Sequence, residues 1–349
     1  MANHAIIIKG AGKAELVEAS IPSLREDYIL VKVKAVALNP TDVLHIDYLA
    51  PVGALVGCDY AGIVEEVGAK VTKPFKKGDR IAGVAHGSNA VNHEDGTFAE
   101  VITVKGDLQI HIPDTISFEE AATLGIGITT VGQALYQSLG LVLPEQSASS
   151  KQPILIYGGS TATGSLAVQY AKQSGMLVIA TASAHNFDYV KSLGADEVFD
   201  YTSLTCAEDI KKSTEGELTL ALDCISKGSS TQICVEAISD KGGVYTTLLP
   251  VPSEKVTSIN EKIENKSTLA YTAIGEAFQF GPQSFPAIPG HFEFAKKFWS
   301  ISEKLLAEGK IKVHQIAVNE GGSGLEGILQ GLQRLRAGDV RGRKLVYTL

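Results

Sequence analysis

The chain has 349 residues, of which 44% are hydrophobic and 20% are charged, and its formal net charge is −8. This length exceeds what one hydrophobic core holds and predicts two domains in a soluble globular protein. The negative net charge argues against binding to nucleic acid, which requires a basic surface, and against binding to an anionic membrane. No apolar run is long enough to span a bilayer.

The N-terminal third predicts short β-strands joined by tight turns. The opening MANHAIIIKGAG reads as a first strand without the charged-then-apolar form of a signal peptide, so we expect a cytoplasmic protein. Residues 29–38 alternate, residues 56–83 are punctuated by glycine, and residues 98–104 form another strand pattern. This texture favours a barrel-like β-domain.

The next segments lead into a second domain. Residues 118–139 (FEEAATLGIGITTVGQALYQSL) predict one bridging helix, and residues 141–152 predict a mobile surface insertion rich in proline and serine. ILIYGGSTATGSLAVQYAK at residues 154–172 then predicts a buried strand, a glycine turn and a helix over 162–174. That order presents a helix N-terminus to a pyrophosphate, with the hydroxyls of Ser160, Thr161 and Thr163 as further donors; a purely structural turn is the alternative.

A second strand ends near Thr181, where dinucleotide folds meet the adenosine ribose. An acidic residue there selects NAD, but the residues present are Ser183, Ala184, His185 and Asn186. These small polar donors suit a 2′-phosphate and favour NADP over NAD. Alternatively, Ser183 or Asn186 caps the following helix.

Further strands continue the pattern and predict a parallel sheet with helical crossovers. A third strand lies within residues 193–201 and places Tyr201 where its ring could cover the adenine. Residues 219–225, 242–249 and 269–275 predict the fourth, fifth and sixth strands, while IKVHQIAV and GRKLVYTL near the C-terminus predict strands that return to the barrel.

The cysteines Cys58, Cys206, Cys224 and Cys234 form no C-x-x-C pair, and their spacing suits no structural zinc knuckle. Cys224 reads as a buried thiol. Cys58 sits beside Asp59 with no histidine at short ligand spacing, although histidines at 45, 86, 93 and 111 leave open a site assembled in space. We therefore expect no zinc.

Several motifs together resemble the medium-chain dehydrogenase/reductase superfamily: ALNPTD (37–42), GCDYAGIVEEVG (57–68), FKKGDRIAG (75–83), the cofactor turn and RGRKLVYTL (341–349). Zinc-dependent members carry a Cys ligand and a Gly-His-Glu motif, which this chain lacks. The resemblance implies an α/β protein with a GroES-like β-barrel catalytic domain (1–115 with 314–349) and a Rossmann dinucleotide-binding domain (116–313).

Within the zinc-independent branch, YGGSTATG, ATASAHNFDYVKSLGADEVFDY and ALDCIS are most similar to fungal trans-acting enoyl reductases of highly reducing polyketide synthases. The resemblance implies NADPH as cofactor and a polyketide synthase, with an acyl chain on its carrier protein, as partner. It implies cofactor contacts by Thr41, Asp42, Val43, Leu44, Ser160, Thr161, Ala162, Thr163, Ser183, Ala184, His185, Asn186, Tyr201, Leu248, Leu249, Leu345 and Val346. It implies acyl contacts by Ile126, Gly127, Ile128, Thr129, Thr130, Val131, Gly132, Gln133, Gly275, Glu276 and Ala277.

The proton donor remains open. Family members often carry a lysine where this chain has Leu44, which leaves His45 and Tyr60 as candidates; both could equally be structural. Water could also protonate the α-carbon. Two other functions stay open: a stand-alone quinone or enone reductase, and a non-catalytic NADPH-binding partner subunit.

Residues 274–294 contain five phenylalanines and three prolines. The phenylalanines could line an acyl pocket or pack the loop onto the core. Because proline obstructs edge pairing between subunits, the segment favours a monomer.

Overall fold

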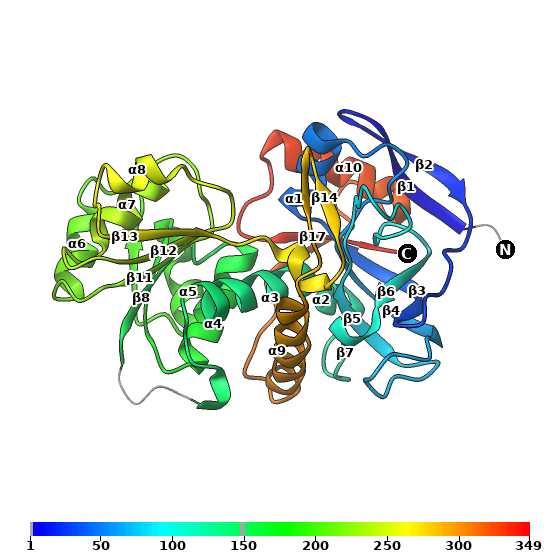
Figure 1. The fold of residues 1–349 in the computed structure, drawn as a ribbon, viewed down its shortest axis with the longest axis horizontal. Helices are drawn as coiled ribbons and strands as arrows, with labels where there is room; N and C mark the ends of the chain where they lie inside the picture. Colours follow the sequence, from blue (N-terminus) through cyan, green and yellow to red (C-terminus); the bar gives the residue numbers. More distant parts are fainter. Residues whose placement is uncertain (1–2, 147–150) are drawn as a thin grey trace. The chain divides into compact units, whose positions relative to one another are not determined.

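The computed structural model describes residues 3–146 and 151–349, which divide into two compact units (Figure 1). Unit 1 comprises residues 1–129, 270–309 and 313–349, and unit 2 comprises residues 130–269 and 310–312. The fold is α/β, as predicted. Residues 147–150 of the predicted surface insertion lie outside the described residues.

Unit 1 is built on a mainly antiparallel sheet with the strand order β16-β17-β3-β4-β5-β7, and β6 pairs with β3. These strands are β3 (Tyr28–Ala37), β4 (Asp59–Val67), β5 (Arg80–Val84), β6 (Val101–Lys105), β7 (Gln109–His111), β16 (Ile316–Val318) and β17 (Lys344–Thr348). Two hairpins accompany the sheet: β1 (Asn3–Gly10) with β2 (Lys13–Ala19), and β14 (Phe278–Phe280) with β15 (Gln283–Phe285).

The helical segments of unit 1 are α1 (Pro40–Leu44), η1 (His45–Leu49), η2 (Gly106–Leu108), α2 (Phe118–Ala121), η6 (Ala270–Ile274), α9 (Pro289–Ala307) and α10 (Gly324–Ala337). Alternate residues of β3, such as Ile29, Val31 and Val33, are buried in the main core of this unit. The alternation read in residues 29–38 therefore reports a real sheet face.

Unit 2 is a parallel sheet with the order β10-β9-β8-β11-β12-β13. Its strands are β8 (Pro153–Tyr157), β9 (Leu177–Ala182), β10 (Glu197–Asp200), β11 (Leu220–Asp223), β12 (Gly243–Thr247) and β13 (Ile263–Ser267). In chain order this is 3-2-1-4-5-6, the doubly wound arrangement that binds dinucleotides at the carboxyl ends of its strands. The predicted Rossmann sheet is confirmed.

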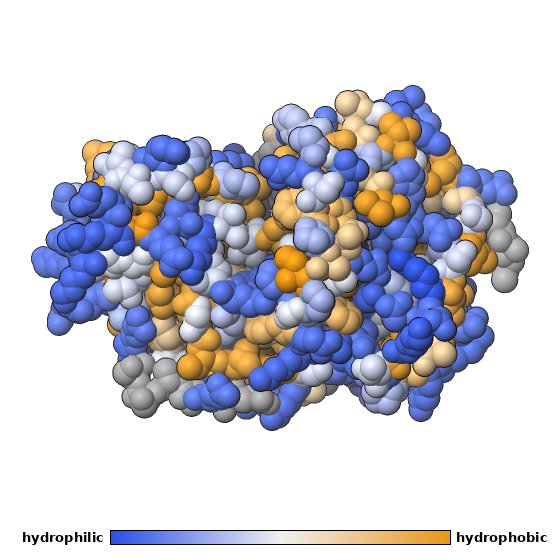
Figure 2. All heavy atoms as spheres, in the orientation of Figure 1, coloured by the Kyte–Doolittle hydropathy of each residue, from blue (hydrophilic) through white to orange (hydrophobic). Residues whose placement is uncertain are grey.

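The helical segments of unit 2 are η3 (Gln133–Ser138), η4 (Pro144–Gln146), α4 (Ala162–Gln173), η5 (Ala184–Asn186), α5 (Phe187–Ser192), α6 (Cys206–Ser213), α7 (Ser230–Ala237) and α8 (Ser253–Thr257). Thr129, the last residue of the first segment of unit 1, lies within α3 (Gly125–Gly132), so the chain passes from unit 1 into unit 2 within this helix. No helix in the described ranges is long and apolar enough to cross a membrane. Figure 2 shows hydrophobic residues interspersed among hydrophilic ones on the face in view.

The prediction of one helix over 118–139 was wrong, because α2, α3 and η3 replace it. The first break falls at residues 122–124, and α3 begins at Gly125. A Cβ there would lie 2.4 Å from the Asp59 carboxylate and from the Gly83 carbonyl, so glycine allows the chain to pass close to both. The local sequence pattern does not indicate that Gly125 lies against Asp59 and Gly83, because both are remote from it in the chain.

The sixth strand was also predicted in the wrong place. Residues 269–275 form the turn η6 in unit 1, and the edge of the parallel sheet is instead β13, with the polar sequence IENKS. An apolar run reports burial but not conformation, and Tyr271, Ala273 and Ile274 are indeed buried. An edge strand needs fewer apolar side chains, so the search for apolar runs did not identify β13.

The compact units differ from the predicted domains, because residues 116–129 and 270–309 belong to unit 1. Two contacts show why. The backbone N–H and Nδ1 of His111 on β7 both lie within 2.9 Å of the Glu303 carboxylate on α9. Trp299 on the same helix donates its indole N–H to the Thr129 hydroxyl.

Candidate functional site

The glycine turn of unit 2 is built around Gly158, whose φ of +82° suits glycine. Its carbonyl passes so close to the following helix that a Cβ on Gly164 would lie 2.1 Å from it. The Gly159 N–H donates to the Thr181 carbonyl and the Gly158 N–H to the Thr181 hydroxyl. Two glycines and Thr181 therefore fix the turn at the carboxyl end of β8.

Thr161 is the N-cap of α4. Its hydroxyl accepts the Gly164 N–H at 3.0 Å and donates to the Gly158 carbonyl at 2.8 Å, so in this structure it is committed to the turn and not to a phosphate. The helix geometry directs the N–H groups of Ala162 and Thr163 outward from the first turn, and residues 160–163 are half-buried. This cradle fits a pyrophosphate.

Ser183, Ala184, His185 and Asn186 follow β9 in a 3₁₀ turn at the same sheet edge. Among the described residues neither Ser183 nor Asn186 makes a side-chain capping hydrogen bond, so the capping alternative is not what these side chains do. The Asn186 amide lies 3.2 Å from His185 Nε2, and Ser183 Oγ donates to the Tyr201 hydroxyl at 3.3 Å. The structure thus brings together Ser183 and Tyr201, two residues of the predicted adenosine end of the cofactor site.

Leu248 and Leu249 follow β12. Their backbone N–H groups lie 3.1 and 3.3 Å from Ser226 Oγ, in the turn after β11. The buried Asp223 holds this turn by accepting the N–H groups of Ile225 and Ser226. Sequence reasoning missed Asp223 and Ser226, although an acid at the end of an apolar strand (LALD) was a visible signal.

In unit 1, Thr41, Asp42, Val43 and Leu44 lie on α1. Asp42 Oδ2 accepts the Asn39 N–H at 2.7 Å, and burial raises the pKa of Asp42 to about 8. Leu345 and Val346 lie on β17 beside the chain that enters this helix: the Leu38 N–H donates to the Leu345 carbonyl, and Val346 pairs with Ala37. The structure therefore gathers these two predicted cofactor segments.

His45 and Tyr60, the two candidate acids, have different surroundings. The Tyr60 ring is fully buried and its hydroxyl donates to Gln109, an arrangement that favours a structural role. His45 Nδ1 lies 2.8 Å from the Thr41 carbonyl and 3.2 Å from the Thr41 hydroxyl, and burial lowers the pKa of His45. We interpret His45 as a neutral imidazole.

Tyr271 of η6 completes this group, and sequence reasoning missed it because residues 269–275 read as a strand. Its hydroxyl lies 2.8 Å from the Thr41 hydroxyl and 3.6 Å from Cys58 Sγ. The Tyr271 ring stacks on His86 and meets His45 edge-on. A hydroxyl of the predicted nicotinamide segment is thus held in a buried aromatic cluster.

Asp59 joins three predicted segments and was also missed as a site residue. It accepts hydrogen bonds from the Asn39 amide at 2.8 Å, from the Ile126 N–H and from the Lys344 ammonium. Asn39 precedes α1, Ile126 opens the predicted acyl segment on α3, and Lys344 precedes Leu345. The sequence did offer a signal: Asp59 and Lys344 are charged residues within predicted strands that are otherwise mainly apolar, and a buried charge needs a partner.

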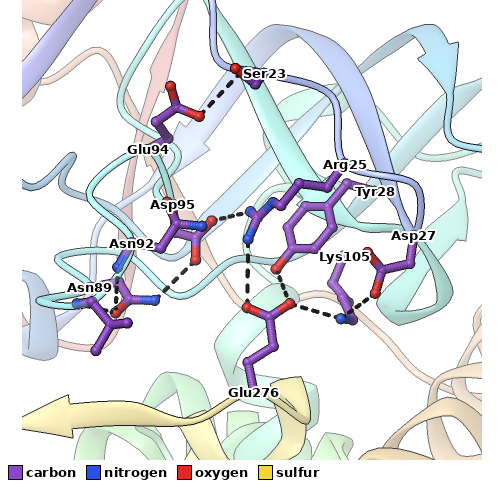
Figure 3. Close-up of polar contacts among 11 residues, drawn as sticks. Ser23, Arg25, Asp27, Tyr28, Asn89, Asn92, Glu94, Asp95, Lys105 and Glu276 are labelled. Carbon is purple, nitrogen blue, oxygen red and sulfur yellow. Dashed lines mark hydrogen bonds and ion pairs between the residues drawn. The ribbon is translucent and has the colours of Figure 1, made fainter.

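The remaining acyl residues lie on α3, at the start of η3 and in the loop after η6. Gly275, Glu276 and Ala277 form that loop, and the Glu276 carboxylate contacts Tyr28, Lys105 and Arg25 (Figure 3). Of the phenylalanines, Phe278 is buried and stacks on Phe285, while Phe280 contacts His45. These contacts are packing contacts within unit 1.

The surroundings of Cys58 and Asp59 do not fit a zinc ion. Cys58 faces the Tyr271 hydroxyl, its pKa is raised by burial, and Asp59 is paired with Lys344. Within residues 3–146 and 151–349, no group of three or more His, Cys, Asp or Glu side chains is placed to hold a metal ion.

Two families of known domains match the chain. An alcohol dehydrogenase GroES-like domain matches residues 25–114, and a domain described as zinc-binding dehydrogenase matches residues 162–287. The chain is therefore an oxidoreductase of the medium-chain dehydrogenase/reductase superfamily, as the motifs predict.

The chain is 48% identical to trans-enoyl reductase ACTTS2 of Alternaria alternata, over all of this chain and 99% of that protein. It is 54% identical to trans-enoyl reductase TOXD of Cochliobolus carbonum, over 84% of this chain and 98% of that protein. The chain belongs to the trans-enoyl reductase family. The predicted family is thereby confirmed.

Solved structures agree on the fold. A putative zinc-dependent alcohol dehydrogenase from Rhizobium etli CFN 42 superposes with a TM-score of 0.81 at 22% identity, covering 100% of this chain and 98% of that one. CurK enoyl reductase gives 0.76 at 20% identity and covers 99% of each chain. At these identities the likeness concerns the fold alone.

Proposed function

We propose that this protein is a trans-acting enoyl reductase that uses NADPH to reduce the α,β-double bond of a polyketide thioester bound to the carrier protein of a polyketide synthase. The observation that carries the proposal is the near-full-length identity with named trans-enoyl reductases.

The parallel sheet supports cofactor binding through its own residues. NADPH, when bound, supplies the hydride that forms the new C–H bond at the β-carbon of the thioester. The N–H groups of Ala162 and Thr163 would hold the pyrophosphate, and Ser183, His185 and Asn186 would donate to the 2′-phosphate. Tyr201 would cover the adenosine.

Reduction moves the electron pair of the double bond onto the thioester oxygen as an enolate, and the α-carbon then takes a proton. Polar hydrogens held in a dry site stabilise such an oxyanion strongly. Thr41, fixed by Tyr271 and His45, presents a hydroxyl in the predicted nicotinamide segment. Positioning and exclusion of water account for much of such a rate, so a strong acid is not required, and water can supply the proton.

The decisive experiment incubates the protein and NADPH with a crotonyl thioester, a free quinone and a carrier-bound polyketide. We expect turnover of the thioester and faster turnover of the carrier-bound substrate. Turnover of the quinone alone would identify a stand-alone quinone reductase instead. Binding of NADPH without turnover of any thioester would identify a non-catalytic partner subunit.

The cofactor preference is tested separately by titrating the protein with NADPH and NADH. Because each lost hydrogen bond to a charged phosphate costs about 1.5–3 kcal/mol, replacing either Ser183 or His185 with alanine should weaken NADPH binding at least about tenfold. NADH binding should change little. Equal affinity of the wild type for both cofactors would disprove the 2′-phosphate site.

A further inference from the structure

The loop Gly275–Ala277 is anchored to the barrel by one side chain. Glu276 Oε1 accepts the Tyr28 hydroxyl at 2.7 Å and the Lys105 ammonium at 2.8 Å, and Oε2 lies 3.5 Å from Arg25 (Figure 3). All of these residues belong to unit 1. The Glu276 carboxylate is therefore occupied by protein groups.

The groups that hold Glu276 are themselves fixed. Tyr28 and Lys105 are buried at the paired ends of β3 and β6, and Lys105 also pairs with Asp27. The Arg25 guanidinium lies 3.3 Å from the centre of the Tyr28 ring and pairs with the buried Asp95. A rigid strand pair and a stacked arginine thus define where Glu276 can lie.

The neighbours of Glu276 in the loop cannot anchor it. Gly275 has no side chain, and its φ is +79°; a Cβ there would lie 2.8 Å from Phe292. Ala277 is exposed. On either side the chain is buried again, at Ile274 of η6 and Phe278 of β14. Glu276 is consequently the polar anchor of a short loop between two packed ends.

We propose that Glu276 is a positioning residue: its carboxylate, held by Tyr28 and Lys105, fixes the backbone of Gly275–Ala277 as a wall for the acyl chain. This inference rests on the proposed function. It also revises the expected role of Glu276, because the loop then offers its backbone and the Ala277 methyl group to the acyl chain, and not the carboxylate.

The test compares Tyr28→Phe and Glu276→Ala, with Glu320→Ala as the matched control. Glu320 is a carboxylate of similar exposure in unit 1, but it pairs with Arg334 and Arg343 and not with the groups that hold Glu276. Loss of the anchor removes binding that ground state and transition state share, so KM for a long 2-enoyl thioester should rise about tenfold in both variants while kcat stays within about twofold. The NADPH affinity and the control variant should match the wild type.

The outcomes separate the alternatives. A higher KM in Glu276→Ala alone would mean that Glu276 touches the acyl chain itself, and an unchanged KM in both variants would mean that the anchor has no role; either result overturns the proposal. If Tyr28→Phe fails to fold, judged by Trp299 fluorescence, Lys105→Gln replaces it, because it removes the other partner of Glu276 Oε1 and leaves Glu276 intact, and it should raise KM in the same direction.

Amide hydrogen exchange provides a readout that does not need turnover. The amides of Gly275–Ala277 should exchange faster in Tyr28→Phe and Glu276→Ala than in the wild type or in Glu320→Ala. If the wild type turns over no thioester, the proposed function fails, and this exchange measurement alone decides whether Glu276 anchors the loop. Unchanged exchange would overturn the anchor.

Discussion

The Asp59–Lys344 pair is among the most deeply buried charges of unit 1. The side chain of Lys344 is 4% exposed and that of Asp59 is fully buried. Asp59 is also hydrogen-bonded to Asn39 and Ile126, and the Lys344 ammonium donates to the Thr123 carbonyl. With these groups satisfied, the pair orders the starts of α1 and α3 more than it adds stability.

Lys344→Met should lower the free energy of unfolding of unit 1 by about 3–5 kcal/mol, because the variant leaves the Asp59 carboxylate buried without its cation. The double variant Asp59→Asn with Lys344→Met should recover much of that loss. Trp299, the single tryptophan of the sequence, is buried in unit 1, so urea unfolding followed by its fluorescence measures this unit. Equal stability of the single variant and the wild type would contradict the expectation.

The buried His86 makes unit 1 sensitive to acid. Burial lowers the pKa of His86 from 6.5 to about 3, so the unfolded chain binds a proton there that the folded chain does not. The contribution to stability is full above pH 6.5 and falls by about 1.4 kcal/mol per pH unit as the pH drops toward 3.

We expect His86→Phe, which keeps an aromatic ring against Tyr271, to reduce this loss. Between pH 6.5 and pH 5 the unfolding free energy of the wild type should fall by about 2 kcal/mol more than that of the variant. Urea titrations of Trp299 fluorescence at the two pH values measure the difference. Parallel losses would show that His86 does not titrate on unfolding.

Among the elements, α4 depends on its cap. Thr161→Val keeps the shape of the side chain but removes the hydroxyl that bonds Gly158 and Gly164. It should destabilise the helix N-terminus by about 1 kcal/mol and weaken NADPH binding, because the turn loses its order. Exchange of the first α4 amides and a NADPH titration measure both effects.

Thr161→Ser is the matched control, since it retains the hydroxyl and should behave as the wild type does. If valine and serine give the same affinity and the same exchange, the capping hydroxyl does not order the turn. A serine variant that lost affinity while keeping its amide protection would instead point to the threonine methyl group.

Local sequence patterns predicted some of these elements and missed others. β8, α4 and β9 were predicted almost to the residue, because a buried strand, a glycine turn and an amphipathic helix each carry a period or a special backbone requirement. The break before Gly125 and the edge strand β13 were missed, since both depend on partners remote in sequence. Asp59 and the Gly83 carbonyl are what require glycine at position 125.

For the whole molecule we predict a monomer. The β14–β15 hairpin carries short strands flanked by Pro282 and Pro286, which offer few donors for pairing with a second copy. Light scattering coupled to size exclusion should therefore give a mass near 36.9 kDa. A mass of about twice that value would show that another surface pairs two copies.

The sequence by itself determined the family, the glycine turn and the doubly wound sheet apart from its edge strand β13, because these rest on local periodicity and on motifs contiguous in the chain. Tertiary structure decided which side chains meet: Tyr271 with Thr41, Lys344 with Asp59, and Glu276 with Tyr28. Such pairs join residues more than 200 positions apart, and no local pattern encodes them. The physical reason is that burial and partner choice for a polar group are set by the fold around it.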